Sequence, residues 1–248
     1  MTTALIDGDS IGYTIAWNLR DEADQNLVLY SVDNFVQNIM VTIEADQYIG
    51  ALSSSPVFRN QIYKFAPYKG TRRPENEEIK RWRPAIMAHL YEEWKFESIP
   101  DLEADDIVSW HACTREDTII CSPDKDLRQI PGKLYNYNTG ELITITPGKA
   151  QEFFDEQMVC GDTTDNIKGI PGMGEVKYLE QVKKGKTPLD MYIKYFGEYY
   201  GYIIYQETLS TVMMMSPNHP QSPFFELPLS LLQPIIYKAK NSLEDTLG

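Results

Sequence analysis

Short apolar runs that end in carboxylates constrain the fold of this chain more than any other feature. Acidic residues occur in four bursts, within ALIDGDS (4–10), LEADD (102–106), SPDKD (122–126) and GDTTDN (161–166). The eight carboxylates of interest are Asp7, Glu103, Asp105, Asp106, Asp124, Asp126, Asp162 and Asp165. Because most bursts follow an apolar run, we expect these side chains to gather at one edge of a sheet, beyond the carboxyl ends of its strands.

Segments of strand length alternate with segments of helical periodicity. Three apolar segments have the length of buried strands: 4–6, 48–52 and 118–122. Three others have the apolar spacing of helices: 32–43, 79–94 and a stretch that opens near Leu102. Pro84 is expected to kink or divide the second helix, a hairpin is predicted around Asn138, and a helix start at Pro147. This order predicts an α/β fold with a mostly parallel sheet covered by helices.

The four bursts offer oxygen ligands and no soft ones. Like charges gathered at one edge of a sheet repel one another unless a cation neutralises them. The chain has three histidines and three cysteines, all widely separated, so the ligands that zinc prefers are lacking. An all-oxygen cluster indicates Mg²⁺ or Mn²⁺. Acids at a helix N-terminus are also favoured by the helix dipole alone, but four bursts together favour a divalent-metal phosphoryl-transfer enzyme.

The charge distribution leaves room for nucleic acid on an acidic protein. The net charge is −13, but much of it sits in carboxylates that a metal would neutralise. The stretch from residue 59 to residue 83 contains eight basic residues and three acidic ones. The basic residues, which we call the basic strip, are Arg59, Lys64, Lys69, Arg72, Arg73, Lys80, Arg81 and Arg83. The strip is compatible with phosphate contact, and a solvated helix face is the alternative explanation.

A glycine-punctuated turn, GIPGMGE (169–175), follows the last acidic burst. We expect Gly169, Gly172 and Gly174 to allow tight turns with positive φ and to leave backbone N–H groups bare. A helix is predicted to begin near Gly174. Bare amides at a helix N-terminus suit a DNA phosphate, although a turn that joins two helices explains the glycines as well.

The opening residues, the hydropathy and the cysteines indicate a cytosol-like protein. The opening residues turn acidic by Asp7, unlike a secretory segment, and no apolar stretch approaches the roughly 20 residues of a membrane span. An odd count of three cysteines without metal spacing indicates reduced thiols. We therefore expect a cytoplasmic protein, and a monomer.

Taken in order, IDGDS, YKGTR (68–72), LEADD, SPDKD and GDTTDNIKGIPGMGE closely resemble the motifs of the 5′-nuclease superfamily over residues 4–185. That family holds flap endonucleases, phage 5′→3′ exonucleases and the 5′-nuclease domain of bacterial DNA polymerase I. The compact size is most similar to the phage-encoded members. The resemblance implies a PIN-like core over 1–146 with an arch around 64–100, and a helical region over 147–215 that completes the metal site. That region would hold a helix–three-turn–helix, and a proline-broken tail packed on the core would span 216–248.

The resemblance also implies roles for individual residues. The eight carboxylates would bind two Mg²⁺ or Mn²⁺ ions, and Lys69 and Arg72 would contact the scissile phosphate as catalytic residues. The turn 169–174 would hold the DNA backbone, often with a K⁺ ion on its carbonyls. The DNA-contacting residues would be Tyr68, Arg73, Gly169, Gly172, Gly174 and Lys177. The implied activity is hydrolysis of DNA phosphodiesters at or near 5′ ends, flaps or junctions, in phage-type replication or recombination.

The chain departs from the family pattern in three places. The family's acid after the second strand is missing near Ser53 and Ser54, and Asp9 could compensate through a water. The turn carries Val176 where a lysine is usual, with Lys177 next, and the segment between YKGTR and LEADD is short. The missing acid keeps a rival reading open, a DNA-structure-binding protein with a weakened metal site. A PIN-type ribonuclease is a further alternative.

Overall fold

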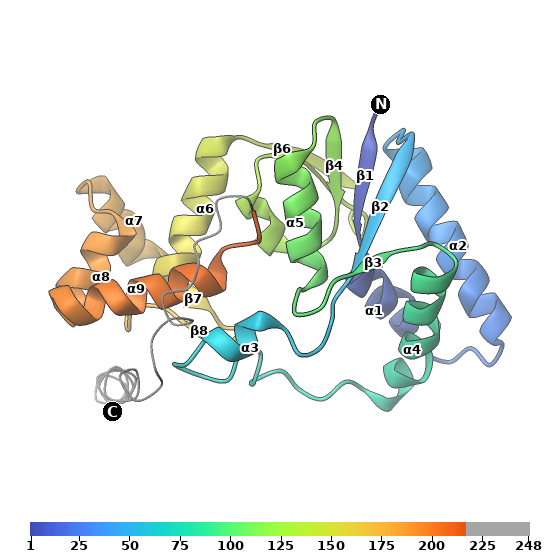
Figure 1. Ribbon diagram of the computed structural model, residues 1–248, viewed down its shortest axis with the longest axis horizontal. Helices are drawn as coiled ribbons and strands as arrows, with labels where there is room; N and C mark the ends of the chain where they lie inside the picture. The colour runs from blue at the N-terminus through green and yellow to red at the C-terminus, as the bar shows by residue number, and fades with distance from the viewer. Residues whose placement is uncertain (217–248) are drawn as a thin grey trace. The chain divides into compact units, whose positions relative to one another are not determined.

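A computed structural model describes residues 1–216 of the chain, which form two compact units (Figure 1). Among the described residues, the first unit comprises Met1–Val57, Arg73–Ala150 and 214–216. The second comprises Phe58–Arg72 and Gln151–Met213. Each unit is therefore assembled from segments that are far apart in the sequence. From residue 217, the tail predicted over 216–248 lies outside the described residues.

The first unit is built on a six-stranded sheet in the order β3-β2-β1-β4-β5-β6. Its strands are β1 (Thr3–Asp7), β2 (Gln47–Leu52), β3 (Glu97–Ser98), β4 (Thr118–Cys121), β5 (Gly132–Asn136) and β6 (Glu141–Ile145). Neighbouring strands are parallel except for β5 and β6, which form the predicted hairpin. The mostly parallel sheet is confirmed, while the short β3 was not predicted.

Helices cover both faces of this sheet, as the alternation of side chains along β1 requires. Ala4 and Ile6 belong to a core formed with α1 (Gly8–Asn18), α2 (Gln25–Thr42) and α4 (Glu77–Glu92). Leu5 points the other way, into a core formed with α5 (Ala104–Thr114). Figure 1 shows α5 on one side of the strands and α1, α2 and α4 on the other. Because both faces are buried, the carboxyl ends of the strands are left as the place for polar side chains.

Helix α4 contains Pro84 and remains a single helix, so the predicted division does not occur. The buried residues of α4 continue on both sides of the proline: Ile79, Trp82, Ile86 and Leu90. Their three- and four-residue spacing packs the helix against α1 and α2. This packing compensates for the backbone hydrogen bond that Pro84 removes. The part of the predicted arch that α4 forms is therefore packed on the core of the first unit.

Two helices were not predicted. Helix α1 begins at Gly8, directly after β1, because Asp7 caps its N-terminus. Helix α3 (Phe58–Ile62) lies between the strand predicted over 48–52 and the helix predicted over 79–94. Its Arg59 is 2% exposed and donates from Nε to the Thr211 carbonyl at 2.8 Å. Arg59 therefore anchors the second unit from within and is not part of a phosphate-binding surface.

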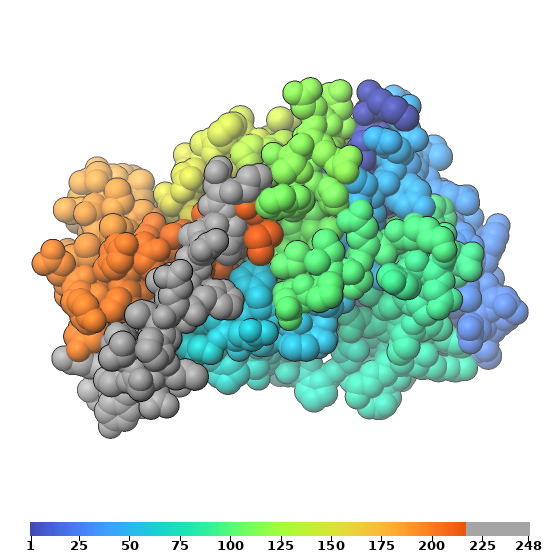
Figure 2. Space-filling model, in the orientation of Figure 1, coloured from blue at the N-terminus to red at the C-terminus, as the bar shows by residue number. Residues whose placement is uncertain are grey.

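The second unit is mainly helical. Helix α6 (Pro147–Cys160) begins at the predicted Pro147 and leads into a hairpin of β7 (Gly161–Asp162) and β8 (Ile167–Lys168). Helices α7 (Glu175–Lys183), α8 (Pro188–Phe196) and α9 (Glu198–Val212) follow. Helices α8 and α9 pack on each other, and the orange surface in Figure 2 comprises α7, α8 and α9. Among residues 1–216, no helix is both long and apolar enough to cross a membrane.

Candidate active site

Asp7 ends β1 as a buried carboxylate that is held by neutral donors. Its Oδ1 accepts from the backbone N–H of Asp9 at 3.0 Å and of Ser10 at 3.4 Å. Its Oδ2 accepts from the hydroxyls of Ser10 at 2.7 Å and Ser122 at 2.8 Å. Burial, the charge of Asp9 and, more weakly, the charge of Asp124 together raise the pKa of Asp7 to about 6, while the hydrogen bonds from the Ser10 and Ser122 hydroxyls act in the opposite direction. The raised pKa means that the surroundings of Asp7 do not compensate the negative charge of its ionised form.

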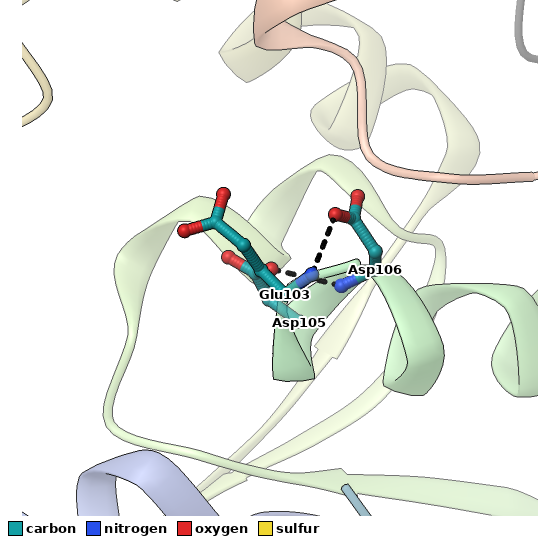
Figure 3. A group of neighbouring side chains, drawn as sticks. All are labelled: Glu103, Asp105 and Asp106. Carbon is teal, nitrogen blue, oxygen red and sulfur yellow. Dashed lines mark hydrogen bonds between the residues drawn. The ribbon is translucent and has the colours of Figure 1, made fainter. Parts of the chain in front are cut away.

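The LEADD motif forms an acidic cluster at the N-terminus of α5 (Figure 3). Glu103, Asp105 and Asp106 each bring one carboxylate oxygen to within 4.8 Å of the others. Asp105 and Asp106 both lie in the first turn of α5. Asp106 is fully buried, and its Oδ2 accepts from the Glu103 backbone N–H at 3.2 Å. The cluster therefore caps the helix and gathers three oxygen ligands at the same time.

Asp124 and Asp126 follow β4. Asp124 caps the 3₁₀ helix η1 (Lys125–Gln129), and its Oδ1 accepts from the Asp126 backbone N–H at 2.8 Å. The Asp124 backbone N–H donates to Ser122 Oγ at 3.0 Å, and that hydroxyl donates to Asp7 Oδ2 at 2.8 Å. A single serine therefore ties the acidic end of β1 to the acidic end of β4.

Six of the eight predicted ligands thus belong to the first unit and come from the end of β1, the end of β4 and the start of α5. Strands β1 and β4 are parallel neighbours, and α5 packs on the face of the sheet that holds Leu5. The donors are carboxylate oxygens, several of them buried and bonded to neutral N–H and O–H groups. This set fits a hard divalent cation such as Mg²⁺ or Mn²⁺ and does not fit a metal that needs nitrogen or sulfur.

The other two predicted ligands, Asp162 and Asp165, lie in the second unit. Asp162 Oδ1 accepts from the backbone N–H groups of Thr164 at 2.7 Å and Asp165 at 3.3 Å. Asp165 Oδ1 accepts from Arg72 Nη2 at 2.6 Å, and its Oδ2 accepts from the Tyr68 hydroxyl at 2.9 Å. In contrast to Asp7, Asp165 therefore has a cationic partner.

Lys69, the other predicted phosphate contact, also converges on Asp165. Its Nζ lies 3.8 Å from Asp165 Oδ2, and its backbone N–H donates to the Asp165 carbonyl at 2.8 Å. Lys69 has a left-handed backbone with φ of 56°, a strained conformation for a residue with a side chain. The motif YKGTR thus folds around Asp165. Its two cationic side chains, Lys69 and Arg72, lie side by side on this carboxylate, an arrangement that can also bind another anion. Arg73 belongs to the first unit and is exposed.

The glycine turn has one positive φ among the three glycines for which this was expected. Gly172 has φ of 67°, whereas Gly174 caps α7 with φ of −90°. Gly169 is required for a different reason, because a Cβ there would lie 2.3 Å from the backbone carbon of Cys160. Lys177 Nζ donates to the Gly172 carbonyl at 2.8 Å. The turn therefore presents a positive charge next to the start of α7.

The basic strip is not a single basic surface. Besides the buried Arg59, Arg83 Nη1 lies 2.6 Å from Glu75 Oε1, and Lys80 Nζ lies 2.6 Å from Glu77 Oε1. These ion pairs neutralise part of the charge on α4, in line with the alternative of a solvated helix face.

Three serines at the site were not assigned a role from the sequence. Ser10 and Ser122 hold Asp7, and Ser53 donates its backbone N–H to Asp9 Oδ1 at 3.2 Å. Their adjacency to the acidic motifs was the only signal. Contacts of this kind depend on which strands are neighbours, and the local sequence does not specify that.

Comparison with known proteins agrees with this architecture. Residues 2–161 match the family described as 5′-3′ exonuclease, N-terminal resolvase-like domain. Flap endonuclease Xni of Shewanella loihica is 30% identical over 149 residues, covering 54% of this chain and 57% of that protein. The thermostable DNA polymerase I of Thermus caldophilus is 25% identical over 199 residues, covering 73% of this chain and 24% of the polymerase. The chain thus spans about a quarter of the polymerase and just over half of the flap endonuclease.

A more complete match in length is the 5′-3′ exonuclease of Mycoplasma genitalium, 26% identical over 77% of this chain and 75% of that protein. Among solved structures, T5 5′-exonuclease with bound zinc has a TM-score of 0.68 at 16% identity, over 99% of this chain and 98% of that one. At 16% identity, the structural likeness shows only that the two proteins share a fold. The family match covers most of the chain, including the ends of β1 and β4 and the start of α5. The chain belongs to the family of the 5′-3′ exonuclease N-terminal resolvase-like domain.

Proposed function

We propose that this protein is a divalent-metal-dependent 5′ nuclease that hydrolyses DNA phosphodiesters at or near 5′ ends. Its substrates would be DNA with free 5′ ends, flaps or junctions between single strand and duplex, in replication or recombination of the phage type. The proposal is supported by family membership and by the names of the related proteins, a flap endonuclease and a 5′-3′ exonuclease.

The observation that carries the proposal is the acidic cluster at the start of α5, with three carboxylate oxygens within 4.8 Å of one another. Glu103, Asp105 and Asp106 repel one another at this distance unless a cation lies among them. We assign these residues, together with Asp7, Asp124 and Asp126, to the binding of Mg²⁺ or Mn²⁺ in the first unit. Asp162 and Asp165 are assigned as metal ligands contributed by the second unit.

Divalent ions bound by these carboxylates would lower the pKa of a bound water molecule and neutralise the charge that develops on the phosphate. The protein's own contribution is to hold the ligands in place. Ser10 and Ser122 donate their hydroxyls to Asp7 Oδ2, backbone N–H groups donate to its Oδ1, and the start of α5 holds the three acids of LEADD. Such outer contacts orient metal ligands in the same way as those around other metal sites.

Lys69 and Arg72 are assigned to the scissile phosphate. Both carry a positive charge beside Asp165, at 3.8 Å and 2.6 Å respectively. A phosphate oxygen and a carboxylate oxygen are similar acceptors for a guanidinium group. The cations would therefore exchange Asp165 for the substrate and stabilise the negative charge of the transition state.

The turn at Gly172 is assigned to the duplex backbone, with Tyr68, Arg73, Gly169, Gly174 and Lys177 as further DNA contacts. The Lys177 ammonium group and the exposed start of α7 favour a phosphate at this place. A helix–three-turn–helix, and a K⁺ ion on the turn carbonyls, remain part of the proposal.

The test is cleavage of 5′-labelled flap, nicked and blunt DNA duplexes with Mg²⁺ or Mn²⁺, with product lengths resolved on a gel. Metal-dependent release of short 5′ fragments is expected, and the product lengths distinguish an exonuclease from a flap endonuclease. An RNA duplex of the same sequence tests the ribonuclease alternative. DNA binding without cleavage in either metal would instead favour the structure-binding alternative.

A further inference from the structure

We infer that Asp9 supplies a carboxylate to the divalent-metal site at the end of β2, where Ser53 and Ser54 offer none. The inference rests on the proposed function and adds to it a residue that lies outside the eight assigned ligands. It also replaces the expectation that a missing acid at this strand leaves the site weakened.

The first step is the position of the Asp9 side chain. Strand β1 ends at Asp7, and Asp9 lies in the first turn of α1. In the sheet, Asp7 pairs with Ala51 of β2, so the chain leaves β2 beside the start of α1. Asp9 Oδ1 accepts the backbone N–H of Ser53 at 3.2 Å. The carboxylate of Asp9 therefore lies at the carboxyl end of β2, next to the backbone of the residue whose own side chain carries no charge.

The second step is the link from this point to the acidic cluster of α5. Ser53 Oγ accepts the backbone N–H of Ala104 at 2.9 Å, and Ala104 lies between Glu103 and Asp105. On its other side, Asp9 donates its backbone N–H to Asp7 Oδ1 at 3.0 Å. Asp9 thus stands between the acid that ends β1 and the acids that begin α5. A chain of direct hydrogen bonds joins all three places within the first unit.

The third step is the charge. An acid in the first turn of a helix is favoured by the helix dipole, and the bond to Ser53 could serve only to hold the loop after β2. Asp9, however, also adds a negative charge beside Asp7, and like charges at short range are unfavourable without a cation. The purely structural role needs an acceptor oxygen, which an asparagine supplies. The metal role needs the charge.

Asp9→Asn separates these two roles, because it keeps an acceptor for the Ser53 N–H and removes the charge. Mn²⁺ binding to the protein without DNA would be measured by calorimetry and by the electron paramagnetic resonance of free Mn²⁺. We expect the Mn²⁺ affinity of Asp9→Asn to fall roughly tenfold or more, the range seen when a supporting group of a metal site is lost. Asp21→Asn is the matched control, since Asp21 follows α1 and its side chain is 88% exposed.

A side-chain swap tests the place as well as the charge. Asp9→Ser alone should weaken Mn²⁺ binding, and Asp9→Ser combined with Ser53→Asp should restore much of it. This pair also keeps the inference testable if Asp9→Asn folds poorly, as judged by thermal unfolding in EDTA. Equal weakening in the single and the double variant would contradict the equivalence of the two positions.

The outcomes also distinguish this inference from the proposed function. Unchanged Mn²⁺ binding in Asp9→Asn, with a wild type that binds Mn²⁺ and cleaves 5′ ends, would overturn only the role of Asp9. A wild type that binds no Mn²⁺ and cleaves no DNA would overturn both.

Discussion

Asp7 of the first unit and Asp165 of the second unit are held in opposite ways. Asp7 is buried, its hydrogen-bond donors among the described residues are backbone N–H and hydroxyl groups, and its pKa is raised to about 6. In the second unit, Asp165 is also nearly buried, but Arg72 and Lys69 lie 2.6 Å and 3.8 Å from its oxygens. The arrangement around Asp7 leaves a negative charge that a bound cation would stabilise. The arrangement around Asp165 already holds positive charges, which an anion from outside can share.

This difference suggests a division of labour between the units. Carboxylates with neutral partners are suited to holding metal, because protein cations do not compete for their oxygens. Cations with an acidic partner are suited to substrate, because the acid keeps them in place until a phosphate arrives. Under this view, Asp165 has two possible partners, a metal ion and the basic pair, and each of the following experiments tests one side of the contrast.

The largest effect is expected from the acids of the first unit. Asp124→Ala should lower turnover by orders of magnitude with the fold intact, because a ligand with no substitute is lost. Turnover would be measured on a 5′-labelled flap in saturating Mg²⁺, with Asp21→Ala as the control for net charge. Full cleavage in EDTA, or wild-type turnover in Asp124→Ala, would remove the basis for the metal site.

The next effect concerns the cations of the second unit. Arg72→Ala and Lys69→Ala should each lower kcat by roughly 10²–10³, as for other groups that stabilise transition-state charge. Duplex affinity should change little. Arg73→Ala is the matched control, because Arg73 is exposed and assigned to DNA binding, so its loss should reduce affinity and spare kcat. Weak binding with normal turnover at saturation in Lys69→Ala would show that this lysine only binds DNA.

The pH dependence of stability tests the unneutralised charge of Asp7. Its pKa rises from 3.8 to about 6 on folding, so the folded state holds the proton more tightly than the unfolded state. Asp7 should therefore contribute about 3 kcal/mol to the stability of the metal-free protein below pH 4, and this contribution should be lost as the pH rises through 6. Urea unfolding in EDTA between pH 4 and 7 measures this loss.

Two comparisons sharpen that measurement. Asp7→Asn should flatten the dependence on pH, because it removes the group that titrates. Mg²⁺ should stabilise the wild type more at pH 7 than at pH 5, because metal competes with the proton for the carboxylate. A metal-free protein that grows more stable from pH 4 to 7 would contradict the assignment.

The smallest effect is expected at the glycine turn. Gly172→Asp adds a negative charge, and a side chain in a left-handed conformation, where a phosphate would approach. It should weaken duplex binding severalfold with little effect on single strands, as measured by fluorescence anisotropy. Gly185→Asp is the control, because Gly185 also has a positive φ, of 73°, a Cβ there meets no atom within 4 Å, and this residue is not assigned to DNA. Equal loss on duplex and single strand would indicate that the turn has only a structural role.

Much of the first unit could be predicted because its signals are local. A short apolar run predicts strand β4, and apolar residues spaced three and four apart predict α2. Helix α1 was missed because its first residues, Gly8 to Ser10, carry no apolar periodicity. It forms because Asp7 supplies the cap. Helix α3 was missed because prolines and glycine surround it, and its anchor at Arg59 uses carbonyls about 150 positions later.

The site could be predicted in its residue types but not in its pairings. The acids of LEADD and SPDKD are recognisable because they follow apolar runs in a fixed order. The contact of Asp165 with Arg72 spans 93 positions, and that of Ser53 with Asp9 spans 44. Such pairs depend on the final arrangement of the strands and loops. The sequence therefore did not indicate that Asp165 is paired with cations, and it named Asp9 as a compensating acid without showing its bond to Ser53.

The bond between Arg59 and the Thr211 carbonyl also bears on synthesis of the chain at the ribosome. The two residues are 152 positions apart, so translation separates them by on the order of 10 s. The strands of the first unit are complete once Ile145 has emerged, whereas residues 58–72 must wait for α9 before they can reach their final partners. The segment that carries Lys69 and Arg72 is therefore among the last to mature, and the proposed activity would appear only after nearly all of the described residues had been made.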